Sequence, residues 1–220
     1  MKKIVILPAA LAMALSGHPQ VNSPNPEGFV TRGELMYRDN NYTGAIDQLT
    51  SPETGLASPD DIEAAAYTAA LAYLKSGSIE EARRELVKFV DEYPASRFRL
   101  EAKMGIADCD FFDGNYKKAL AGYRKIDKGG LNLAAQEDYD YRTAYCLMML
   151  GDYDKALAGF RRLRGVDRYA GASRFYQGYI YYAHGAYAEA KKYFTEADTR
   201  TAPGNRAPYY LTQIAYIDHD

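Results

Sequence analysis

Residues 114–123 read Gly-Asn-Tyr-Lys-Lys-Ala-Leu-Ala-Gly-Tyr, and residues 151–160 read Gly-Asp-Tyr-Asp-Lys-Ala-Leu-Ala-Gly-Phe. The second stretch copies the first at a displacement of 37 residues, from 114 to 151, so the chain contains an internal repeat. Each copy begins with glycine, which readily adopts left-handed backbone angles, and continues with apolar residues near helical spacing. The pattern predicts a repeat unit of helix, tight turn and helix.

The same pattern occurs five times along the chain. Its alanine recurs at Ala45, Ala82, Ala119, Ala156 and Ala190. The turn residue that precedes it is Asn40, Gly77, Gly114, Gly151 or Gly185, and the large apolar residue four places after it is Leu49, Leu86, Tyr123, Phe160 or Phe194. Four residues make about one helical turn, so the alanine and the large residue share a face. We expect this face to pack closely against the first helix of each pair.

The composition is that of a folded chain. Of its 220 residues, 47% are hydrophobic and 25% are charged, which excludes an intrinsically disordered polymer. A formal net charge of −2 gives no general attraction to nucleic acid, and we expect no nucleic-acid partner. The 21 tyrosines, with no tryptophan, suit half-buried surfaces because each ring has a polar tip.

The first residues are interpreted as a targeting segment. Two lysines at 2–3, an apolar run over 4–15 and small residues at Ala12, Ala14 and Ser16 predict a signal peptide over 1–16. Pro8 and the shortness of the run argue against a spanning helix, although an uncleaved interfacial anchor is the alternative. Residues 17–25 are predicted to form a flexible leader. We therefore expect export across the inner membrane to a periplasmic or envelope-associated location, with no stable transmembrane span.

Small residues in the first helices complete the pattern, at Gly33, Ala70, Ala107, Ala144 and Gly178. Together with the turn glycine, tyrosine, alanine and aromatic residue, they resemble the tetratricopeptide repeat family over about residues 26–220. The resemblance implies an all-α fold, a right-handed α-solenoid of five helix-turn-helix repeats plus one extra helix. The repeats lie near 26–59, 63–96, 100–133, 137–170 and 171–204, with a partial copy over 205–220.

Two further features qualify the resemblance. Residues 93–96 (Tyr-Pro-Ala-Ser), with Phe89 and residues 101–102, are similar to the periplasmic members of the family that act in outer-membrane assembly and Tol-Pal coordination. The first-helix tryptophan of the family is missing, and Asp110 replaces the Met, Tyr or Leu of the other copies. A carboxylate at that place requires a partner or water, because unpaired burial is costly.

The resemblance also implies a binding surface, because first helices line the concave side of such solenoids. The residues that it assigns to partner binding are Tyr67, Leu71, Met104, Asp108, Phe111, Tyr141, Tyr145, Met148, Phe175, Tyr179 and Tyr182. Roughly half of such aromatic and methionine residues are expected to pack between helices, since these side chains usually fill cores. The others are expected to form an adaptable groove for a peptide or helix.

No pattern of catalysis, cofactor binding or metal ligation is present in the sequence. It lacks a phosphate-binding glycine loop, a nucleophile elbow and metal-ligand spacing, and Asp108, Asp110 and Asp113 do not match a calcium loop. We expect a non-enzymatic protein-binding scaffold of the bacterial cell envelope. The alternatives are a glycan-binding protein or an accessory protein of outer-membrane uptake or assembly that uses the same aromatic surface.

Two smaller expectations concern the cysteines and the last helix. Cys109 and Cys146 are 37 residues apart and so occupy equivalent places on neighbouring helices, too far apart for a disulfide. They are predicted to be free, buried thiols. Residues 208–217 resemble a sixth first helix with no partner helix after it, so we expect either a longer protein or docking through this open end.

Overall fold

The computed structural model describes residues 26–200 and 202–217, and the predicted signal peptide and leader lie outside them. Eleven α-helices make up this part of the chain, which contains no strand. They are α1 (Pro26–Arg38), α2 (Tyr42–Leu49), α3 (Pro59–Ser76), α4 (Ile79–Glu92), α5 (Arg99–Phe112), α6 (Tyr116–Tyr123), α7 (Leu133–Met149), α8 (Tyr153–Arg162), α9 (Asp167–Ala183), α10 (Tyr187–Thr195) and α11 (Ala207–Ile217). Short 3₁₀ turns over 54–56, 128–130, 163–165 and 204–206 lie between successive pairs.

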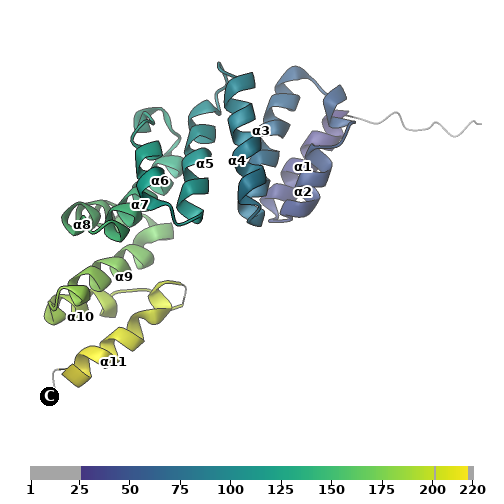
Figure 1. The fold of residues 1–220 in the computed structure, drawn as a ribbon. Coiled ribbons are helices and arrows are strands. Elements are labelled where there is room, and N and C mark those ends of the chain that lie inside the picture. The colour runs from purple at the N-terminus through teal and green to yellow at the C-terminus, as the bar shows by residue number, and fades with distance from the viewer. Residues whose placement is uncertain (1–25, 201, 218–220) are drawn as a thin grey trace, which may run out of the picture.

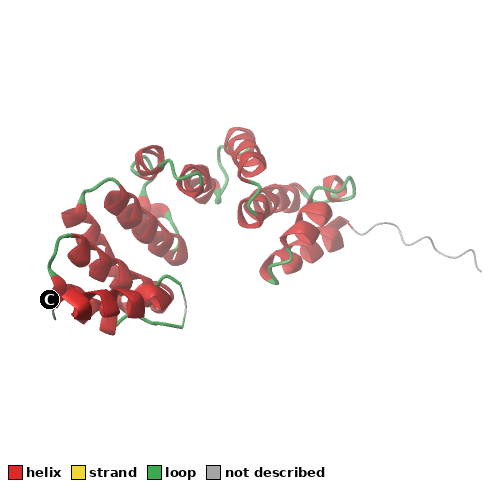
Figure 2. Cartoon of the chain, turned by 60° about the horizontal axis from the view of Figure 1, so that its bottom comes forward, coloured by secondary structure: helices red, strands yellow, loops and turns green. Residues whose placement is uncertain are grey.

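The helices form five consecutive pairs and one additional helix, in the order that the repeats predict. Each odd-numbered helix packs against the helix that follows it, and the pairs stack along a curved path (Figure 1). Figure 2 shows the same curve from another side, with helices joined by loops along its whole length. The all-α solenoid predicted from the repeat is confirmed.

The turns between paired helices require left-handed backbone angles. Asn40 has a φ of 61° and Gly151 a φ of 82°, and the other turn residues predicted by the repeat, Gly77, Gly114 and Gly185, also have positive φ. Glycine takes these angles without a steric penalty, and asparagine tolerates them better than most residues. At the start of α3, the Ser58 side chain accepts a hydrogen bond from the Asp61 amide, and Pro59 begins the helix.

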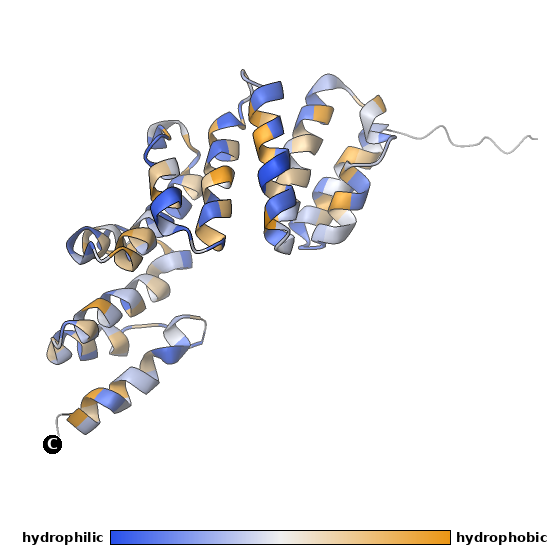
Figure 3. Ribbon diagram, in the orientation of Figure 1, coloured by the Kyte–Doolittle hydropathy of each residue, from blue (hydrophilic) through white to orange (hydrophobic). Residues whose placement is uncertain are grey.

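The repeated alanine and its large neighbour form the interior of each pair. All five alanines are 0% exposed, and Leu49, Leu86, Tyr123, Phe160 and Phe194 are buried beside them. In α4, Ala82, Leu86 and Phe89 make the buried face, and Figure 3 shows hydrophilic and hydrophobic segments alternating along this amphipathic helix. The expected face of small and large residues is therefore the core of the solenoid.

Small residues allow the two helices of a pair to approach closely. A Cβ added to Gly159 in α8 would lie 2.7 Å from the Cβ of Ala144 in α7, which is closer than two carbon atoms can pack. In the first pair, a Cβ on Gly33 would overlap the side chain of Leu49. Two kinds of contact, small against small and small against large, thus produce the same close packing.

Candidate functional site

A concave cavity lies on the inner side of the curve, between the first helices of four successive repeats. Its volume is about 220 Å³. The side chains and backbone around it come from α1, α3, α5, α7 and the segment just before α7: Tyr37, Tyr67, Leu71, Leu74, Lys75, Glu101, Met104, Gly105, Asp108, Asn132, Ala134, Ala135, Asp138 and Arg142. Successive repeats present equivalent positions to one space because they stack in register. We call this space the concave cavity.

Four residues of the predicted binding set border the concave cavity, namely Tyr67, Leu71, Met104 and Asp108. Tyr67 is half-buried, and its ring stacks on Phe98 with a centroid distance of 4.6 Å. Leu71 is partly exposed and packs beside the core of the second repeat. These two side chains combine a fixed position with an accessible surface, as a binding residue requires.

Three predicted binding residues are buried and act as core residues in this structure. Met104, Met148 and Phe175 are 4%, 5% and 3% exposed. Met104 and Met148 belong to the central core cluster, and Phe175 packs on Phe194. Neighbouring helices cover these side chains and leave little of their surface accessible, and their role in partner binding stays a prediction.

The other predicted aromatic residues form a tyrosine cluster between repeats. Tyr141 and Tyr145 of α7 both contact Tyr176 of α9, and Phe111 of α5 packs edge-on against Tyr145 at 5.3 Å between centroids. Burial raises the pKa of Tyr141 to about 12, so its hydroxyl stays protonated at neutral pH. Tyr141, Tyr145 and Phe111 are half-buried, so each joins two helices and exposes part of its ring.

Tyr179 and Tyr182 continue the aromatic residues towards the last helix. Both rings contact Tyr210 of α11 edge-on, at centroid distances of 5.8 Å and 5.1 Å. Tyr179 is 37% exposed and Tyr182 is half-buried. Of the predicted set, Tyr179 therefore offers the most accessible aromatic ring.

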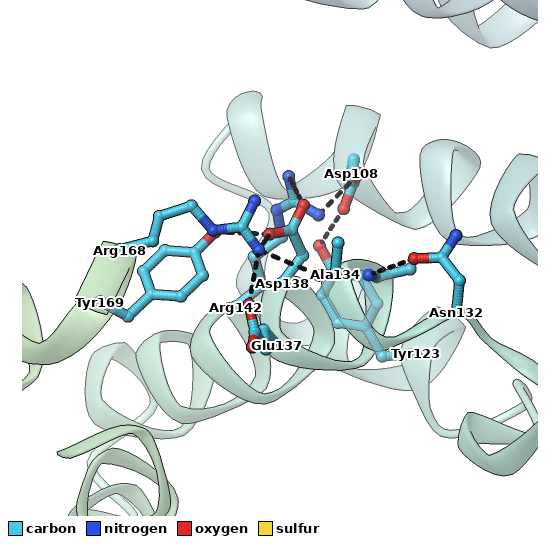
Figure 4. A network of polar contacts seen from close by, with 10 residues as sticks. Asp108, Tyr123, Asn132, Ala134, Glu137, Asp138, Arg142, Arg168 and Tyr169 are labelled. Atoms are coloured by element: carbon cyan, nitrogen blue, oxygen red, sulfur yellow. Dashed lines mark hydrogen bonds and ion pairs between the residues drawn. The ribbon is translucent and has the colours of Figure 1, made fainter. Parts of the chain in front are cut away.

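A network of charges crosses three repeats beside the concave cavity (Figure 4). The guanidinium of Arg142 lies 3.0 Å from a carboxylate oxygen of Asp108 and 3.5 Å from one of Asp138. The hydroxyl of Tyr123 donates to the other oxygen of Asp108 at 2.7 Å. Asp138 is also paired with Arg168 of α9 at 2.7 Å. Each charged side chain of this network therefore has an oppositely charged partner, either in another helix or one turn away in the same helix.

The predicted binding residue Asp108 is the buried member of this network. It is 5% exposed, and burial raises the pKa of its carboxyl group, while Arg142 and the hydrogen bond from Tyr123 act in the opposite direction. The enclosed carboxylate pairs with the guanidinium of Arg142, and its role in partner binding stays a prediction. Through these two contacts Asp108 connects α5 to α6 and α7.

The expectation that Asp110 has a partner is confirmed. Arg83 of α4 lies 3.2 Å from Asp110 and 2.9 Å from Asp113, so one guanidinium joins α4 to both carboxylates. Cys109 and Cys146 are free and buried, as predicted. Burial raises the pKa of each thiol to about 12.

Three first-helix residues, of which only the first borders the cavity, were absent from the predicted set. Arg142 replaces the Gly105 of the preceding repeat, so no periodic signal marked it. Phe112 and Met149 occupy the position of Lys75, which borders the cavity, and they are 52% and 48% exposed. Both lie on first helices, which the family resemblance places along the concave side. Phe112 and Met149 are therefore accessible apolar side chains, whereas Met104 and Met148 are buried.

No helix within 26–200 or 202–217 combines the length and apolar character needed to cross a membrane. Across the same residues, histidine, cysteine and acidic side chains form no group of three that could hold a metal ion.

Solved structures with a similar fold include MamA in its AMB-1 and MSR-1 forms, at 17% and 16% identity. Their TM-scores are 0.56 and 0.58, and the matches cover 81% and 85% of this chain and 94% and 98% of MamA. A Rap protein complexed with competence and sporulation factor matches at 19% identity and a TM-score of 0.61, over 84% of this chain and 56% of Rap. No curated protein matches the sequence.

The family comparison agrees with the repeats and with the stacked helix pairs. The model of the tetratricopeptide repeat-like domain matches residues 59–215, which extend from the start of α3 into α11. This match covers well over half of the chain. The chain therefore belongs to the tetratricopeptide repeat-like domain family.

Proposed function

We propose that this protein is a non-enzymatic scaffold of the bacterial cell envelope that binds a peptide segment or helix of a partner protein along its concave side. The observation on which the proposal depends is the concave cavity, which the first helices of four consecutive repeats line together. Stacked repeats present extended concave surfaces of this kind to their ligands. Export is inferred from the sequence of residues 1–16.

The chemistry of the cavity favours a peptide over a uniformly apolar ligand. Lys75 and Asp138 provide charges of both signs, while Tyr37, Tyr67 and Leu71 provide apolar surface. A peptide offers backbone amides, carbonyls and mixed side chains to such a surface. The structurally similar Rap protein, complexed with competence and sporulation factor, supports ligand binding as a use of this fold.

The exposed positions Phe112 and Met149 give the sharpest test. A photo-reactive amino acid placed at either position in the full chain, expressed in its native cell, is expected to cross-link one recurrent partner protein. The same probe at Leu56, which is 69% exposed but lies in the connection between the first two pairs, is the control and is expected to capture none.

Substitution completes the experiment. Phe112→Ala combined with Met149→Ala is expected to reduce cross-linking from a probe at Leu71, because the partner loses two apolar contacts, while Leu56→Ala leaves it unchanged. Equal capture from Leu56, or undiminished capture in the double variant with an unchanged circular dichroism spectrum, would show that the concave side is not the binding surface. Binding of the purified chain to a glycan array in place of a protein would favour the competing glycan function.

A further inference from the structure

A second groove, unrelated to the concave cavity, lies on the opposite face of α5. It has a volume of about 570 Å³ and is bordered by α4, α5, α6 and the segment after α6. Ile106 and Ala107 of α5 face it, whereas Met104 and Asp108 face the concave cavity. Since 3.6 residues make one helical turn, these two sets project from opposite sides of the helix. The groove is therefore on the convex side.

The floor of this groove is apolar. Val90 of α4, Ile106 of α5 and Ile126 after α6 provide branched side chains, and Ala121 is exposed at the edge. Gly122 has no side chain, and its backbone lies so close to α5 that an added Cβ would be 2.8 Å from the Cβ of Ala107. A pocket of this size with an apolar floor and charged groups at its edge has the character of a ligand-binding site.

The rim of the groove is positively charged. Lys103, Lys118 and Lys125 border it, and within the described parts of the chain no carboxylate forms an ion pair with any of them. The one acidic residue at the rim, Asp110, is already paired with Arg83. We call this surface the lysine groove. It has an excess of positive charge, although the whole chain is slightly acidic.

The preceding repeat provides an internal comparison. A groove at the equivalent place, about 420 Å³ in volume, is bordered by α2, α3 and α4. There Ala66, Glu85 and Lys88 occupy the positions that Lys103, Gly122 and Lys125 occupy in the lysine groove, 37 residues later. Glu92 adds another carboxylate. The positive rim is therefore absent from the preceding groove, whereas the missing side chain at 122 recurs in the following repeat as Gly159.

We propose that the lysine groove binds an acidic amphipathic peptide segment of a partner protein, with apolar side chains on the floor and carboxylates on the lysines. Lys118 and Lys125 are seven residues apart, roughly 10 Å if the helical rise is extended over this interval. Three lysines, distributed over α5, α6 and the segment after α6, offer separate ammonium groups, so the rim fits several spaced acidic side chains better than a single anionic headgroup. Complementary charge of this kind selects partners and accelerates their association.

The test uses the full chain and synthetic peptides. The probe is a fluorescein-labelled peptide of Glu-Glu-Leu-Leu units, about 12 residues and so ~three helical turns long. Its comparison peptides replace every Leu by Ser or every Glu by Lys. Fluorescence anisotropy is expected to show binding of the first peptide alone. Equal binding of the Glu/Ser peptide would overturn the proposal, because charge without apolar contact would then suffice.

Matched variants place the binding in the groove. Lys118→Glu combined with Lys125→Glu is expected to weaken binding about tenfold or more, since two attractive contacts become repulsive. Lys88→Glu, at the position of Lys125 in the preceding groove, is expected to leave the affinity unchanged. Equal loss in both cases would indicate nonspecific attraction and would contradict the proposal.

A second pair of variants tests the apolar floor independently of charge. Ala121→Phe fills the edge of the groove and is expected to weaken binding of the Glu/Leu peptide. Ala158→Phe places the same ring at the equivalent exposed position of α8 and is the control. Displacement of the bound peptide by phosphatidylglycerol vesicles, at matched charge concentration, would instead assign the groove to a lipid surface and overturn the peptide proposal. These measurements test the lysine groove, whereas the cross-linking experiment tests the concave side. The two proposals can therefore be refuted independently.

Discussion

Cys109 and Cys146 illustrate how a repeat determines the environment of a single residue. They are 37 residues apart, and both side chains are 0% exposed in equivalent positions of α5 and α7. Burial raises the pKa of each thiol to about 12, and nearby Asp108 acts in the same direction on both. The sequence alone predicted that the two cysteines are buried alike, because residues one repeat apart in a stacked fold pack against equivalent neighbours.

Both thiols are expected to be unreactive in the folded protein. The thiolate is the reactive form, and a pKa of about 12 leaves almost none of it at pH 8. A thiol-reactive chromogenic disulfide should therefore label neither cysteine at pH 8 and both after addition of guanidinium chloride. Rapid labelling of the native protein, or a disulfide detected by mass spectrometry without reduction, would contradict this expectation.

The link between α5, α6 and α7 depends on a buried ion pair. Asp108 accepts a hydrogen bond from Tyr123 within its own repeat and pairs with Arg142 of the next repeat. The side chains of Arg142 and Asp108 are only 10% and 7% exposed. Arg142 has no equivalent in the other repeats, so the sequence pattern gave no reason to expect this contact.

Asp108→Ala is expected to lower the free energy of unfolding by about 3 kcal/mol, because it leaves a largely buried guanidinium and a buried hydroxyl without their main partner. The double variant Asp108→Leu with Arg142→Leu should recover most of this loss, since apolar pairs replace buried ion pairs at little cost. Urea unfolding followed by circular dichroism measures both. Lys155→Ala, which removes the exposed cation of a pair with Asp152 and leaves the N-cap of α8 in place, is the control and should change stability by less than about 1 kcal/mol. An equally small effect of Asp108→Ala would show that the buried pair does not hold these helices together.

The stability of the whole solenoid is unevenly distributed. The largest core cluster extends from Met104 in α5 to Ile180 in α9, and it includes the tyrosine cluster at its edge. The cluster around Val30 and Leu49 in the first pair is smaller. In stacked repeats each unit contacts only its neighbours, so local stability follows local burial.

Hydrogen exchange is expected to report this difference. Amides of α7 and α8 should exchange at least about tenfold more slowly than those of α1 and α2, because opening the central pairs exposes more apolar surface. Mass spectrometry of peptic fragments at neutral pH provides the comparison within one sample. Equal protection of both regions would mean that the described helices unfold as a single cooperative unit.

The sequence by itself determined the fold class, the number of repeats, the turn positions and the buried alanines. These features are local or periodic: a turn needs glycine or asparagine, and one helix face needs small and large residues at fixed spacing. The tertiary structure decided which first-helix residues remain accessible. Met104, Met148 and Phe175 are covered by neighbouring helices, whereas Phe112 and Met149 are not. The tertiary structure also placed Arg142 at the concave cavity and Lys118 at the lysine groove. Each of these sites is formed by stacked helices from more than one repeat, and the 37-residue interval does not relate the residues that meet there.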